Sequence, residues 1–175
     1  PTINSQNQHQ TSDNPSFLLK LTIGLIGSFA FLQVYSIQAI LPIIMQDFLA
    51  SETQAGMTVG ATVLAIAIIS PFMGMLSDAI GRKNVILAGL VALGVPTVLL
   101  GFAQNLTTLT FFRFLQGLAV PAITVVLIAY VGEEFRGKTV AKLMSFYVSG
   151  TVLGGFMGRF LMGHFEPWIG WRAGY

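Results

Sequence analysis

The sequence predicts an all-α membrane protein that crosses the bilayer five times. Hydrophobic residues make up 54% of its 175 positions and charged residues only 9%, whereas a soluble domain carries about 25% charged residues. The charges occur in clusters, and the apolar stretches between them reach the roughly 20 residues that a helix needs to cross a bilayer. These stretches are continuous and do not alternate as barrel strands do, and a helix bonds its backbone amides within its own segment.

The chain divides into a polar tail and a partial helical bundle. Residues 1–16 are mostly Gln, Asn, Ser and Thr. Such a segment buries too little apolar surface to offset its ordering entropy, so we expect a disordered tail. It has no basic segment ahead of an apolar core and is therefore not a secretory signal. The bundle takes up residues 17–175, with helices expected roughly at 17–44, 54–76, 84–103, 108–131 and 139–163.

Composition excludes several classes of function. The chain has no cysteine, and its two histidines, His9 and His164, lie far apart in sequence, so we expect no disulfide and no metal site. A nucleic-acid partner is not expected either, because the sequence has no basic arm and no zinc spacing. An enzyme would need a nucleophile–histidine pair, a metal cluster or a phosphate-binding loop. None of these is present in the sequence, so we predict no enzyme and no cofactor, with the lipid bilayer as one partner.

Basic residues predict the orientation of the spans. If successive helices alternate in direction, six basic residues fall on one face of the membrane: Lys20, Arg82, Lys83, Arg136, Lys138 and Lys142. The opposite face carries only Arg172, after the fifth helix. Because Lys and Arg are enriched in cytoplasmic connections, we expect a multi-pass protein of the inner cell membrane with its N-terminus in the cytoplasm.

The connection between the second and third helices carries the most specific motif. It reads Gly74-Met-Leu-Ser-Asp78-Ala-Ile-Gly81-Arg82-Lys83-Asn-Val-Ile86. This resembles the signature of the major facilitator superfamily of transporters, G-x-L-(A/S)-D-x-x-G-R-(R/K)-x-x-(I/L). The sequence departs from the family at Ala79, where Arg or Lys is common. The alternative is an ordinary turn whose charges anchor the membrane boundary.

Each residue of this signature has a physical role that fits a conformational-switch loop. Gly74 is expected to let a neighbouring helix approach closely, and Gly81 to take a positive φ in a tight turn. Asp78 suits the positive N-terminus of a helix. Arg82 and Lys83 are expected to pair with acids and to hold the loop in the cytoplasm.

Arg113 lies inside the fourth expected helix, in the segment Leu109-Thr-Phe-Phe-Arg113-Phe-Leu-Gln116-Gly117. This segment resembles the family motif l-x-x-x-R-x-x-q-G, whose arginine is linked to proton coupling. Arg113 and Gln116 share one helical face. A charge within a membrane helix costs about 2.5–3.5 kcal/mol on insertion scales, which favours a cavity or a polar partner for Arg113. The alternative is an arginine that extends along the helix toward the interface.

The fifth expected helix has a repeated small-residue face at Gly150, Gly154 and Gly158. It resembles the family's antiporter motif g-x-x-x-G-P-x-x-G-G, but Gly155 replaces the proline and Arg159 the last glycine. Small residues at this spacing favour close helix packing over contact with a solute. We expect the partner of this face to come from outside the chain, and we expect Arg159 to reach toward the outer interface.

Polar residues in the first helix are candidates for a substrate cavity. Tyr35, Gln38 and Pro42 share one face, while Gln33 points elsewhere. The family lines its cavity with the first and fourth helices, which implies that Tyr35 and Gln38 face the solute. Hydrogen bonding to neighbouring helices is the alternative for these side chains. Without further helices, we expect Tyr35, Gln38 and Arg113 to face lipid or another copy of the chain.

The resemblance covers residues 17–175 and implies the first five helices of a six-helix bundle, truncated before the sixth. Gln38-x-x-x-Pro42, the fifth-helix glycines and Trp171-Arg172 look most like the YnfM-type, arabinose-efflux or drug:proton antiporter branch. The implied function is secondary active transport of a small solute by alternating access, as proton-coupled efflux of a sugar or drug-like compound. The implied partners are that solute, protons and a missing C-terminal half. The alternative function is a truncated, transport-inactive membrane subunit that acts only by helix–helix association.

Overall fold

A computed structural model of the chain describes residues 15–175, which are almost entirely helical and form no strand. The elements are α1 (Phe17–Ser36), the 3₁₀ helix η1 (Ile37–Ile40), α2 (Leu41–Asp47), α3 (Glu52–Ile80), α4 (Arg82–Leu100), α5 (Leu106–Glu134), α6 (Lys138–Ile169) and the 3₁₀ helix η2 (Trp171–Gly174). Segment 17–47 is one span, and α3 to α6 supply four more that are long and apolar enough to cross a membrane. This confirms the predicted five-span, all-α fold.

The signature segment is helical, although it was expected to be a loop. Gly74 to Ile80 continue α3, and Arg82 already begins α4. The chain reverses at Gly81 alone, whose φ of 97° is unfavourable for a residue with a Cβ. A single glycine with positive φ is therefore enough to join the two spans.

Two other expected boundaries are wrong for related reasons. The fifth span does not end at Gly163, because a glycine ends a helix only where it leaves helical φ and ψ. That occurs at Gly170, with a φ of 74°. At the start of the chain, the predicted disordered tail lies outside the described residues up to position 14. Ser16 was assigned to that tail but caps α1, since its hydroxyl accepts the backbone N–H of Leu19 at 3.2 Å.

The first span is interrupted in its second half. Pro42 has no backbone N–H, so it cannot donate to the carbonyl of Gln38 four residues earlier, and its ring crowds that turn. The helix tightens into η1 over Ile37–Ile40 before α2 resumes at Leu41. The first span is therefore a long and a short α-helix joined by a 3₁₀ segment.

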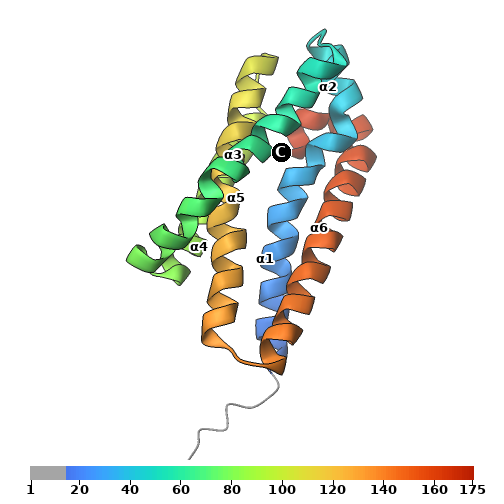
Figure 1. The fold of residues 1–175 in the computed structure, drawn as a ribbon. Coiled ribbons are helices and arrows are strands. Elements are labelled where there is room, and N and C mark those ends of the chain that lie inside the picture. The colour runs from blue at the N-terminus through green and yellow to red at the C-terminus, as the bar shows by residue number, and fades with distance from the viewer. Residues whose placement is uncertain (1–14) are drawn as a thin grey trace, which may run out of the picture.

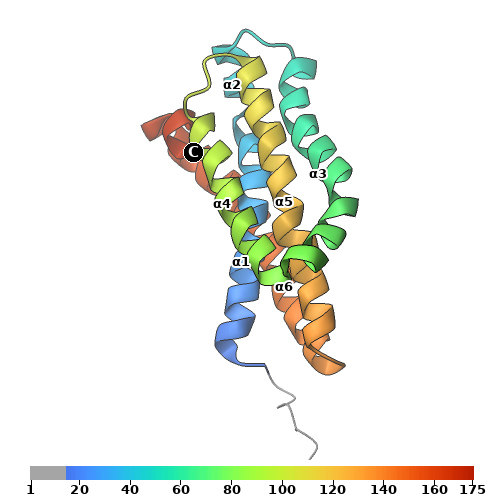
Figure 2. The ribbon, with the colours of Figure 1, turned by 90° about the vertical axis from the view of Figure 1, so that its left-hand side faces the viewer.

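The helices pack as a pair beside a group of three. α1 packs most extensively on α6, and α5 packs on α3 and α4. Figure 1 shows α1 and α6 side by side, and Figure 2, turned by 90°, shows α4 and α3 on either side of α5. Three buried apolar clusters, which contain Val126, Ile44 and Ile123, respectively, form the core. Many large apolar side chains elsewhere are exposed, as expected for helices that face lipid.

The small-residue face of α6 packs against α1. A Cβ added to Gly150, Gly154 or Gly158 would clash with the backbone carbonyls of residues 24, 28 and 32, respectively. The hydroxyl of Ser28 also donates to the carbonyl of Gly150 at 2.8 Å. The expectation that this face has no partner within the chain is therefore wrong. The contact lets the backbones of two helices approach closely, as small-residue interfaces do in membranes.

A substitution on this seam should destabilise the fold. Gly→Ala inside a helix normally stabilises by about 0.5–1 kcal/mol. Gly154→Ala should instead destabilise by about 1–3 kcal/mol, because its Cβ overlaps the carbonyl of Ser28 and forces the helices apart. Denaturant unfolding in mixed micelles, followed by tryptophan fluorescence, measures the change.

Gly163→Ala is the matched control on the same helix, since its Cβ would make an ordinary contact of 3.6 Å with Ala39. Equal stabilities for the two variants would contradict the close α1–α6 contact.

Candidate functional site

Arg113 is completely buried at the centre of the bundle, with 0% of its surface exposed. Its Nη1 donates to the carbonyl of Gln33 at 3.0 Å and its Nη2 to the carbonyl of Val34 at 2.8 Å. Nη1 also donates to Oε1 of Gln116 at 2.8 Å. The side chain therefore neither extends toward the interface nor faces lipid, and the expectation that it is exposed in this chain is wrong.

The two carbonyls bound by Arg113 lie just before the break in the first span. In a regular α-helix they would accept from the N–H groups of Ile37 and Gln38. Those residues belong to η1, where the α-helical pattern ends. The guanidinium supplies charged donors to these two carbonyls and satisfies them inside the membrane.

The polar contacts extend from Arg113 into the neighbouring helices. Nε2 of Gln116 donates to the hydroxyl of Thr97 on α4 at 2.8 Å. The hydroxyl of Thr62 on α3 donates to the backbone carbonyl of Arg113 at 3.0 Å. Gly117 allows this approach, because a Cβ there would overlap the carbonyl of Thr62. The buried network thus connects the first span with α3, α4 and α5.

Arg113 has no carboxylate partner among residues 15–175. Its Nε and the Oε1 atom of Gln33 are buried without hydrogen-bond partners in the same part of the chain. A guanidinium keeps its proton at any physiological pH. Arg113 is therefore suited to positioning span 1 by hydrogen bonds and not to releasing a proton itself.

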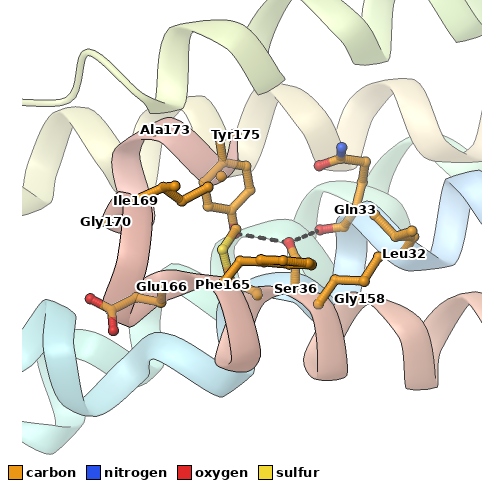
Figure 3. Close-up of a pocket in the computed structure, with 13 residues that line it drawn as sticks. Leu32, Gln33, Ser36, Gly158, Phe165, Glu166, Ile169, Gly170, Ala173 and Tyr175 are labelled. Carbon is orange, nitrogen blue, oxygen red and sulfur yellow. Dashed lines mark hydrogen bonds between the residues drawn. The ribbon is translucent and has the colours of Figure 1, made fainter.

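A cavity of about 260 Å³ lies beside this network, between α1, α6 and η2 (Figure 3). Ser36 connects its wall to the buried site, since its hydroxyl donates to the carbonyl of Gln33 at 3.1 Å and bonds the Tyr175 hydroxyl at 2.9 Å. Burial raises the pKa of the Tyr175 phenol, and the charge of Arg113 and the hydrogen bond between the Tyr175 and Ser36 hydroxyls partly offset this rise. The phenol is therefore neutral at physiological pH. Neither Tyr35 nor Gln38 lines this cavity.

Tyr35 and Gln38 instead meet Arg159 of α6. Nε and Nη2 of Arg159 donate to Oε1 of Gln38 at 2.9 and 2.8 Å. The guanidinium carbon lies 4.3 Å from the centroid of the Tyr35 ring, a cation–π distance. Arg159 was expected to reach for the outer interface, but it is directed across the helix pair onto the first span.

The signature segment brings together the ends of three helices. Arg82 bonds Asp78 on α3 at 2.8 Å, forms an ion pair with Glu133 on α5, and donates to the hydroxyl of Ser77 at 3.1 Å. This matches the expectation that Arg82 pairs with acids. Lys83 forms no ion pair with residues 15–175.

The expectation for Gly74 is wrong within residues 15–175. Apart from the neighbouring turns of its own helix, no described atom lies within 4 Å of the position that its Cβ would occupy, so no other described helix approaches it closely.

Sequence reasoning missed several partners in these sites. The only sequence signal for Thr62 and Thr97 was that they are hydroxyl residues in apolar helices. The backbone carbonyls of the first span give no sequence signal at all. Glu133 gave a weak signal, because it is one of two adjacent acids just after the fourth expected helix. Residues 15–175 also contain no group of His, Cys, Asp and Glu that can hold a metal ion.

Nearly the whole bundle, from residue 23 to residue 175, matches the Major Facilitator Superfamily. The chain belongs to this superfamily. It is 32% identical over 158 residues to an uncharacterized transporter of Buchnera aphidicola subsp. Schizaphis graminum, covering 90% of this chain and 38% of that protein. It is 31% identical over 173 residues to the inner membrane transport protein YnfM of Escherichia coli, covering 98% of this chain and 41% of YnfM.

A multi-drug resistance efflux pump, PmrA of Streptococcus pneumoniae, is 31% identical over 110 residues, which cover 61% of this chain and 28% of the pump. This major facilitator chain therefore spans about two fifths of the length of the first relatives it matches. Its relatives are named as transporters and not as enzymes. The predicted family and its YnfM-type relationship are confirmed.

Removing the buried guanidinium should weaken the bundle. Arg113→Met keeps most of the side-chain volume but leaves the carbonyl of Val34 and the amide oxygen of Gln116 without this donor, while the carbonyl of Gln33 keeps the Ser36 hydroxyl. We expect a loss of about 2–4 kcal/mol of unfolding free energy, because each buried group left unpaired costs about 1–3 kcal/mol. Denaturant unfolding in mixed micelles measures it.

The control is Arg136→Gln, which removes an exposed arginine from the α5–α6 connection and should change stability by less than about 0.5 kcal/mol. An Arg113→Met variant as stable as this control would show that the buried contacts do not hold the bundle.

Proposed function

We propose that this chain is the N-terminal part of a secondary active transporter that moves a small solute by alternating access. Membership in the superfamily supports this, and so does the share of its relatives' length that the chain covers. In alternating access one bundle rocks against another around a site near the membrane midplane. The proposed partner is therefore a second, C-terminal half.

The proposal also names the direction of transport and the coupling ion. Similarity to a multi-drug efflux pump supports export of a drug-like compound or a sugar. Similarity to an inner membrane transport protein supports the inner membrane as the location. Protons are the proposed coupling ion, and the clustering of basic residues supports a cytoplasmic N-terminus.

Arg113 and Gln116 are proposed to contribute to proton coupling indirectly, because they fix the position of the first span. The guanidinium holds that span just before its 3₁₀ segment, and short 3₁₀ stretches within helices often mark hinges. Because the arginine keeps its proton, the groups that gain and lose the coupling proton must be others. The buried network then transmits the movement of the first span to α3, α4 and α5.

The observation that best supports a conformational switch is the ion cluster at the α3–α4 junction. Arg82 pairs with Asp78 and with Glu133, so one guanidinium connects the ends of α3, α4 and α5. Asp78 keeps 65% of its side chain exposed and can bind a further partner. We propose that this cluster stabilises one of two conformations and opens in the other.

A flux measurement tests the proposed function. Proteoliposomes receive either the 175-residue chain or the chain joined to a second half, and a proton gradient is imposed with candidate drugs and sugars outside. Only the two-half protein should give saturable, gradient-driven flux, because alternating access needs two bundles. Flux from the 175-residue chain alone would contradict the two-bundle mechanism. Absence of flux from both would favour the transport-inactive subunit.

Asp78→Asn tests the switch in the two-half protein. The substitution preserves shape but removes the charge that pairs with Arg82. We expect transport to fall about tenfold, the equivalent of about 1.4 kcal/mol, with membrane insertion unchanged. The control is Glu134→Gln, which removes an exposed charge beside Glu133 that forms no ion pair with residues 15–175. Transport by Asp78→Asn at the rate of that control would refute the role.

A further inference from the structure

Arg159 is an exposed charge well inside a membrane-spanning helix. It lies about 25 Å along α6 from Lys142, the last basic residue at the cytoplasmic end, at about 1.5 Å per residue. The helix continues past it through Phe160, Phe165 and Trp168 to Ile169. Arg159 is therefore not at a helix end, where a long basic side chain would normally reach water.

The guanidinium of Arg159 is held in place by side chains of the first span. Gln38 accepts both Nε and Nη2, and the carbonyl of Gly155 accepts Nη1 at 3.3 Å. The ring of Tyr35 lies beneath it and stacks on Phe31, with ring centroids 6.0 Å apart. This arrangement fixes the guanidinium over an aromatic surface instead of leaving it to move in lipid.

Gly155 makes room for this arrangement. A Cβ at this position would come within 3.2 Å of the Tyr35 ring, and the superfamily motif has proline here. The glycine therefore lets the Tyr35 ring lie against α6 directly below Arg159. This sequence therefore differs from the family motif at two positions that both contact Tyr35. Gly155 lets the ring lie close to α6, and Arg159 lies over the ring.

The charge of Arg159 is not balanced within residues 15–175. No carboxylate of the described chain pairs with it, and its three hydrogen bonds go to neutral oxygens. Of the five N–H groups of a guanidinium, two remain for another acceptor. In a low-dielectric environment an uncompensated positive charge attracts an anion strongly, and a carboxylate matches a guanidinium well.

The surface around Arg159 combines polar and apolar groups. By helical spacing, Gly155, Gly163 and Glu166 lie on its side of α6, and so does the exposed Val152, seven residues before it. The bulky exposed residues Leu153 and Trp168 are turned away from this strip. This strip adjoins Tyr35 and Gln38, the two residues of the first span that the sequence assigns to the solute pathway.

We propose that Arg159, fixed over Tyr35 by Gln38, is an anion-binding point of the solute pathway and that the transported solute carries a carboxylate. The inference rests on the proposed transport function and names the charge class of its substrate. The aromatic rings of Tyr35 and Phe31 offer an apolar surface for the rest of the molecule. A lipid headgroup phosphate offers similar oxygen chemistry, and the experiment separates it from a solute.

The test uses the 175-residue chain in nanodiscs of phosphatidylcholine, with arginine side chains labelled with ¹⁵N. Benzoate and its neutral counterpart benzamide are the probes. Benzoate should shift the Arg159 Nε–H resonance saturably, while benzamide should bind at least about tenfold more weakly. Arg159→Gln should lose benzoate binding. Arg159→Lys, which keeps a charge without the planar fork, should bind benzoate with intermediate affinity.

Arg172→Gln is the matched control, because Arg172 also lies near an aromatic ring but pairs with Asp47. It should bind benzoate as the wild type does, and an unchanged Arg113 Nε–H resonance shows that each variant is folded. Equal affinity for benzoate and benzamide, or unimpaired benzoate binding by Arg159→Gln, would overturn the proposal. A shift produced by phosphatidylglycerol but not by benzoate would assign the site to a lipid. These results are independent of flux, so failure of transport leaves the binding result intact.

Discussion

The bundle depends on the burial of one guanidinium in a membrane protein. Arg113 has no exposed surface, and an arginine in a membrane helix is stabilised by pairing with polar groups inside the bundle. Its two Nη atoms donate to two backbone carbonyls of the first span and to the amide oxygen of Gln116. The first span and α5 therefore have a fixed register, although the two helices have few other contacts.

This constraint explains features that otherwise look unrelated. Pro42 interrupts the first span, and the carbonyls freed near the interruption become the acceptors for Arg113. The glycines of α6 then let that helix follow the first span at close range, which brings Arg159 onto Gln38 of the same span. Two arginines, one buried and one exposed, thus contact the first span at or just before its 3₁₀ segment.

Local sequence patterns predicted the five spans, the superfamily and the turn at Gly81, because these depend on composition, hydropathy and one backbone conformation. The partners across the bundle depended on tertiary packing. Backbone carbonyls carry no sequence signal, so the acceptors of Arg113 were not predictable, and Glu133 lies far from Arg82 in sequence. The small-residue face of α6 was recognised, but its partner was not, since any close helix satisfies the same pattern.

The central claim is that Arg113 bonds the carbonyls of the first span within the bilayer. Solid-state NMR of the chain in lipid tests it by the distance between the Val34 carbonyl carbon and the Arg113 Nη nitrogens. Val34 and Tyr35 form the only Val–Tyr pair in the sequence, so ¹³C-carbonyl valine and ¹⁵N tyrosine select this carbonyl. A hydrogen bond of 2.8 Å between Nη2 and the oxygen predicts a carbon–nitrogen distance of about 4 Å. A distance beyond about 7 Å, too long for any hydrogen bond, would contradict the account.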